Sequence, residues 1–101
     1  MGRRLDLHEL LVGVLGSRNV YFQPPSSEKM RYPCIVYQRN RLEIKSANDS
    51  NYNMTTGYML TLVDANPDSV IFEKIARLPM CRFDRHFTAD SLNHDVFTLY
   101  Y

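Results

Sequence analysis

Tryptophan is absent from this sequence of 101 residues, and only 4 glycines and 2 cysteines occur in it. The two cysteines, Cys34 and Cys81, are too few for a disulfide framework and lack the paired spacing of a zinc site. We expect both to be small, buried, apolar side chains, as in a protein of a reducing compartment. The scattered glycines form no phosphate-binding loop, and no HExxH, CxxC or GxSxG motif occurs. The sequence therefore predicts no enzyme activity, no metal and no cofactor.

An excess of charge of one sign is also lacking. The 12 basic and 11 acidic residues give a formal net charge of +1, which provides no overall field to hold a polyanion or an acidic membrane. The apolar runs are far shorter than the ~20 residues of a membrane-spanning helix. The first residues, Met1 to Arg4, lead into an amphipathic segment rather than a signal peptide. We therefore expect an intracellular protein without membrane contacts, in which any contact with nucleic acid is local.

Hydrophobic periodicity predicts two helices. The first spans 5–15 and ends at Gly16. Its apolar stripe is Leu7, Leu10, Leu11, Val14 and Leu15. The second helix begins within the segment 66–69, which combines an N-cap candidate with Pro67 at an early helical position, and it ends before Pro79. Its predicted stripe is Val70, Ile71, Ile75 and Leu78.

Short runs rich in β-branched and aromatic residues predict the strands. An edge strand is expected over 19–23, a central strand over 32–38, and the clearest strand over 57–64, with apolar residues on both faces. Two more are expected over 82–87 and 96–101, joined through a turn over 92–95. The predicted fold is α+β, one domain over 1–101, with a single antiparallel or mixed sheet of about four to five strands and two helices packed on one face.

The segment around 39–56 predicts an extended hairpin arm. The alternation of the second strand falters at Arg39-Asn40-Arg41, which indicates a bulge or a strand leaving the sheet. The polar stretch 46–53 then has almost no residue that could enter a core, as in a hairpin tip or an exposed loop.

Three histidines, His8, His86 and His94, are candidates for a metal or acid–base site. Their carboxylate candidates are Asp6, Asp84, Asp90 and Asp95. None of these residues has a known ligand spacing, so we interpret the histidines as surface or turn residues. His94 is expected in the turn over 92–95.

The 7 tyrosines and 5 phenylalanines exceed what a small core comfortably holds. Tyrosine is favoured at interfaces because its ring buries well while its hydroxyl finds a partner. For the tyrosines, the alternative to an interface is packing in the core of their own chain. Basic residues of the arm are a second group of interface candidates, and the alternative for them is a hairpin face exposed to solvent. The candidate interface residues are Tyr21, Arg39, Arg41, Lys45, Asp49, Tyr52, Tyr58, Tyr100 and Tyr101.

The sequence ends on the predicted strand 96–101, and strand ends fray unless they are paired within a sheet or against a neighbour. Five stretches spanning nearly the whole chain are "DLHELLVGVLG", "VYFQPP", "YPCIVYQ", "YMLTLVDANPDS" and "LPMCRFDRHFTADSLNHDVFTLYY". In combination they resemble the small tail completion or tail terminator proteins of long-tailed, siphovirus-type bacteriophages that infect Gram-positive bacteria.

This resemblance implies a non-enzymatic structural protein of the virion tail or neck, assembled in the host cytoplasm. It implies a homo-oligomeric ring, expected to be a hexamer, that caps the tail tube protein and offers its other face to the head–tail connector or stopper protein. DNA would pass through the lumen without sequence-specific binding. Another neck component is the first alternative. A small nucleic-acid-binding module, and a minor enzyme with a His–Asp or Cys–His pair, are alternatives of other classes.

Overall fold

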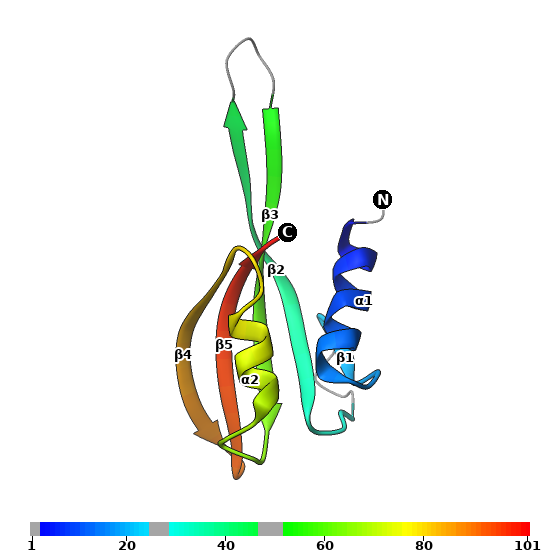
Figure 1. Ribbon diagram of the computed structural model, residues 1–101, viewed down its shortest axis with the longest axis vertical. Coiled ribbons are helices and arrows are strands. Elements are labelled where there is room, and N and C mark those ends of the chain that lie inside the picture. The colour runs from blue at the N-terminus through cyan, green and yellow to red at the C-terminus, as the bar shows by residue number, and fades with distance from the viewer. Residues whose placement is uncertain (1–2, 25–28, 47–51) are drawn as a thin grey trace.

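A computed structural model describes residues 3–24, 29–46 and 52–101, with side chains for all of these except Arg3, 41–46 and 52–55. The two helices are α1 (Arg3–Leu15) and α2 (Val70–Ala76). The strands are β1 (Val20–Phe22), β2 (Cys34–Ser46), β3 (Tyr52–Asp64), β4 (Cys81–Ala89) and β5 (Leu92–Tyr100), and Figure 1 shows their arrangement.

The five strands form one mixed sheet in the order β1-β2-β3-β5-β4. β1 runs parallel to β2, and the other neighbours are antiparallel. Both helices cover the same face of the sheet (Figure 1), and their side chains join one hydrophobic cluster with it. The predicted α+β class is confirmed, with its mixed sheet, its two helices on one face and its first strand at an edge.

The core lies between this sheet face and the helices. Side chains alternate between the two faces of a strand, so every second residue of β2, β3 and β5 enters the core. The register aligns Tyr37 with Leu60 and Leu60 with Phe97, which places a row of large buried side chains across the sheet. The full cluster is Leu7, Leu11, Leu15, Val20, Ile35, Tyr37, Tyr58, Leu60, Leu62, Ile75, Phe97 and Leu99.

The helix ends follow their sequence signals, with one correction. α1 ends where predicted, because Gly16 takes a left-handed φ of 84° and its N–H donates to the Val12 carbonyl at 2.9 Å. α2 begins later than predicted: Ser69 is its N-cap and accepts a hydrogen bond from the Ile71 N–H at 3.2 Å. Pro67 therefore lies in the preceding loop. Neither helix, within the described ranges, has the length and apolar character needed to cross a membrane.

α2 presents a narrower apolar stripe than predicted. Ile75 is fully buried, and Ile71 and Leu78 pack against the core. Val70, which we expected in the stripe, is 68% exposed because the first residue of the helix lies beyond the edge of the core.

The turn between the last two strands lies earlier than predicted. Asp90 and Ser91 form the connection, with left-handed φ values of 54° and 63°, and Ala89 pairs with Leu92. The segment 92–95, expected as a turn, is instead the first half of β5, where Asn93 and His94 pair with both β3 and β4. The left-handed pair Asp-Ser was missed because the usual hairpin signal is Asn-Gly or Asp-Gly.

Replacing Ser91 by glycine should stabilise the protein, because a left-handed residue with a Cβ is strained and glycine is not. We expect Ser91→Gly to raise the free energy of unfolding by roughly 0.5–1 kcal/mol, measured by urea denaturation. Ser91→Ala is the matched control, since it removes the hydroxyl but keeps the Cβ, and it should bring no such gain. Equal stabilities of the two variants would contradict the assignment of strain to this position.

Candidate functional site

The most unusual part of the structure is the arm, the portion of the β2–β3 hairpin with backbone residues 41–46 and 52–56. Parallel pairing of β2 with β1 ends at Tyr37, and pairing of β3 with β5 ends at Gly57, opposite Tyr100. Beyond these points, apart from one backbone hydrogen bond between Tyr101 and Thr56, the described residues of β2 and β3 pair only with each other, out to Ser46 opposite Tyr52. The arm therefore projects from the sheet as a two-stranded ribbon, which Figure 1 shows, and the molecule measures 52 × 25 × 22 Å.

The arm starts at the irregularity that the sequence predicted. The register between β2 and β3 shifts between Arg39 and Arg41, which leaves Asn40 as the extra residue of a bulge. At the same point Arg39 donates its backbone N–H to the Gln23 side-chain oxygen at 3.3 Å. The bulge thus marks the place where β2 leaves the five-stranded body.

The candidate interface residues of the arm have different outcomes. The side chain of Arg39 is exposed at the base of the arm. Backbone pairing places Arg41 opposite Gly57, Lys45 opposite Asn53, and Tyr52 opposite Ser46. Asp49 lies outside the described residues. Four of the predicted residues therefore lie on one hairpin. Of these four, the structure describes the side chain of Arg39 alone.

Two of the candidate tyrosines make contacts within their own chain. Tyr58 is 3% exposed and lies edge-on to Tyr37. Its ring therefore packs in the hydrophobic core of its own chain. Tyr21 is half-buried, and its hydroxyl accepts a hydrogen bond from the Arg31 N–H at 3.2 Å.

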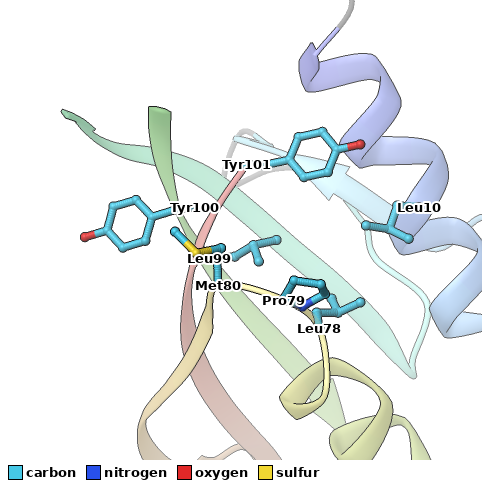
Figure 2. Close-up of a pocket in the computed structure, with 7 residues that line it drawn as sticks. All are labelled: Leu10, Leu78, Pro79, Met80, Leu99, Tyr100 and Tyr101. Atoms are coloured by element: carbon cyan, nitrogen blue, oxygen red, sulfur yellow. The ribbon is translucent and has the colours of Figure 1, made fainter. Parts of the chain in front are cut away.

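The last two tyrosines lie at the base of the arm, at the end of β5. The Tyr100 N–H donates to the Met80 carbonyl and the Tyr101 N–H donates to the Thr56 carbonyl, each at 3.1 Å. The strand end is therefore pinned on both sides, as expected. Both residues are half-buried and line a hollow of about 470 Å³. The Tyr101 ring is directed toward Leu10, whereas the Tyr100 ring points away from it (Figure 2).

This hollow is the feature that sequence reasoning missed. Three parts of the chain form it: α1, the loop between α2 and β4, and the end of β5 (Figure 2). Its lining residues are Leu10, Leu78, Pro79, Met80, Leu99, Tyr100 and Tyr101. Leu10 was expected in the buried stripe of α1, yet it is 37% exposed, and Met80 is 65% exposed. The only sequence signal for the hollow was a helical stripe wider than the core beneath it.

A polar cluster sits at the opposite margin of the helix layer. The Tyr37 hydroxyl lies 2.8 Å from Nδ1 of His8 and accepts from the Arg4 guanidinium at 3.4 Å. That guanidinium also lies over the Phe22 ring, 4.4 Å from its centroid. Burial lowers the pKa of His8 and raises the pKa of Tyr37. The hydrogen bond between His8 and Tyr37 links α1 to β2.

The strongest candidate for acid–base chemistry is His86, whose Nδ1 lies 2.6 Å from Oδ1 of Asp95. The two residues are directly opposite each other in the β4–β5 pair, where such a contact supports strand pairing. A catalytic histidine also needs a nucleophile or substrate within reach, and no described hydrogen bond links His86 to a hydroxyl or thiol. His94 stacks on Phe87 at 4.7 Å. Among the described residues, no group of three metal-ligating side chains is placed to hold an ion.

Neither cysteine has the setting of a nucleophile. Cys34 is buried and Cys81 is half-buried, and both are free thiols. Burial raises the pKa of each thiol to about 11. Both thiols are therefore largely protonated at neutral pH, which makes them weak nucleophiles.

Comparisons of the chain with known protein families, with curated proteins and with solved structures found no match.

Stability should depend on pH through His8. Its pKa is lowered in the folded state, so the unfolded chain binds more protons as the pH falls below about 6.5. The contribution of His8 is thus fully present above that pH and is lost as the pH falls toward the folded-state pKa. We expect His8→Asn, which cannot titrate, to lose less stability than the wild type between pH 7 and pH 5 in urea denaturation. Parallel pH profiles for the two proteins would contradict this role.

Proposed function

We propose that this chain is a structural virion protein that caps the phage tail tube as a ring and forms the head–tail joining interface. The observation that carries the proposal is the arm, whose described strand residues pair only with each other beyond Thr56. A two-stranded ribbon is marginally stable in water unless a further strand or layer packs on it. Contact with a neighbouring copy would supply that layer, and a closed ring gives every arm the same neighbour.

The remaining surface is compatible with an assembling subunit. One face of the sheet has no helix over it among the described elements, and Val36, Met59 and Thr61 are half-buried there. The hollow at the base of the arm adds exposed apolar side chains, chiefly Met80. Exposed apolar side chains such as those beside the hollow are of the kind found at protein contacts.

The partners proposed for such a ring are sister copies, six in the expected hexamer, with the tail tube protein on one side and the head–tail connector or stopper protein on the other. DNA passes through the lumen without sequence-specific binding. A lumen rich in basic residues would retain DNA, so the proposal places Arg39, Arg41 and Lys45 on the outer or tube-facing surface rather than in the lumen.

Electron microscopy of phage particles that lack this protein tests the proposal most directly. A terminator stops tube growth, so its loss should give overlong tails that are not joined to heads. Tails of normal length that remain unattached would indicate a connector-side neck protein instead. Normal, joined particles would contradict both assignments.

Complementation provides the control for this experiment. The wild-type chain supplied in trans should restore joined tails of normal length. A variant that lacks 46–53 should not restore them, because it removes the arm tip while leaving the paired body of the sheet intact. Full rescue by this variant would contradict the role given to the arm.

A further inference from the structure

The hollow and the arm lie next to each other and share an apolar character. The Tyr101 N–H, at the rim of the hollow, bonds to Thr56 at the base of the arm. Figure 2 shows Leu10, Leu78 and Tyr101 around the opening, on the side of the sheet that the helices cover. None of the described residues that line it is charged, so it is suited to an apolar occupant.

The arm carries apolar residues in one of its two alternating sets. In β3 the set that supplies the core residues Tyr58, Leu60 and Leu62 continues outward through Thr56 and Met54. The register pairs Leu42 with Thr56 and Ile44 with Met54, so both residues of β2 join the same set. The other set contains Arg41, Glu43 and Lys45.

The bulge at Asn40 is what brings these residues together. Without the extra residue, the β2 set that contains Ile35 and Tyr37 would continue through Arg41 and Lys45. With it, Leu42 and Ile44 extend the set that the helices cover in the body. The apolar pattern of the core therefore continues onto the arm, where no described helix accompanies it.

The chain cannot bring its own arm to its own hollow without breaking this register. The arm leaves the sheet at Gly57 and projects away from the body (Figure 1), and none of the described residues that line the hollow belongs to the arm. The apolar hollow and the apolar residues of the arm thus occupy different places on one chain. Contacts of this kind are heterologous, head to tail, and they produce rings or filaments of identical copies.

We infer that the hollow lined by Leu10, Leu78, Met80 and Tyr101 receives the apolar set of the arm, Leu42, Ile44 and Met54, from a second copy of this chain. The inference rests on the proposed ring and identifies its contact. A small-molecule ligand fits the site less well, because such pockets contain several placed polar groups. Among the described residues that line the hollow, only the two tyrosines have a polar side-chain group, and the Tyr100 ring points away from Leu10 and Leu78 (Figure 2).

Disulfide cross-linking tests the contact directly. In a Cys81→Ser background, which leaves only the fully buried Cys34, one protein carries Ile44→Cys and a second carries Leu10→Cys. Oxidation of an equal mixture of the full-length proteins should give the mixed dimer at least fivefold above either homodimer. Lys45→Cys, from the other set of the arm, and Leu5→Cys, exposed on α1 outside the hollow, are the matched controls and should give background yields.

A charge in the hollow tests the same contact by affinity. Met80→Glu and Val70→Glu replace apolar residues of similar exposure, 65% and 68%, but only Met80 lines this hollow. We expect Met80→Glu to weaken self-association at least tenfold in analytical ultracentrifugation, with Val70→Glu close to wild type. Circular dichroism of both variants checks that the fold is retained.

The outcomes separate this inference from the proposed function. Rings that form normally with Met80→Glu, and without the specific cross-link, overturn the contact and leave the ring in place. Equal maleimide labelling of Leu10→Cys before and after assembly assigns the hollow to some other occupant and also overturns it. Absence of self-association by the wild type, both alone and on purified tail tubes, overturns the contact and the ring together.

Discussion

The constraint on which the structure depends is the unequal length of its strands. β2 and β3 contain 13 residues each, whereas β5 contains 9 and β1 only 3. In the body, the shorter strands and the helices cover both edges and one face of this hairpin. Beyond Gly57 it has neither neighbouring strands nor a helix layer among the described elements. An isolated two-stranded ribbon is only marginally stable in water, and we propose that contacts with other chains stabilise this one.

The body is stabilised independently of the arm. Its cluster of buried side chains joins α1, α2 and the sheet, and the end of β5 is pinned by hydrogen bonds to Met80 and Thr56. The same pinned end forms one wall of the apolar hollow. The base of the arm is therefore held by backbone hydrogen bonds to the end of β5, and the apolar hollow lies directly beside it. In the proposed ring, this arrangement couples the order of each arm to the presence of a neighbour.

Local sequence signals predicted most of the fold, and long-range packing decided the rest. The bulge at Asn40, the end of α1 at Gly16 and the edge position of β1 followed from periodicity and backbone preference. The predicted position of the last turn was wrong because the turn residues, Asp90 and Ser91, do not include the glycine that usually marks a hairpin turn. The hollow could not be predicted, since it joins Leu10 to residues that are nearly seventy or more positions distant in the sequence, and no local pattern encodes that distance. Tyr58 shows the same limit: its type suits an interface, but its place in the register puts it in the core.

Amide hydrogen exchange of the arm, compared between the dissociated chain and the assembled ring, tests the central claim most directly. The account predicts that amides of 41–46 and 52–56 exchange rapidly in the dissociated chain and become strongly protected on assembly. The amides of Leu60 to Val63 in the body should remain equally protected in both states. Identical exchange of the arm in the two states would contradict the claim that sister copies cover it.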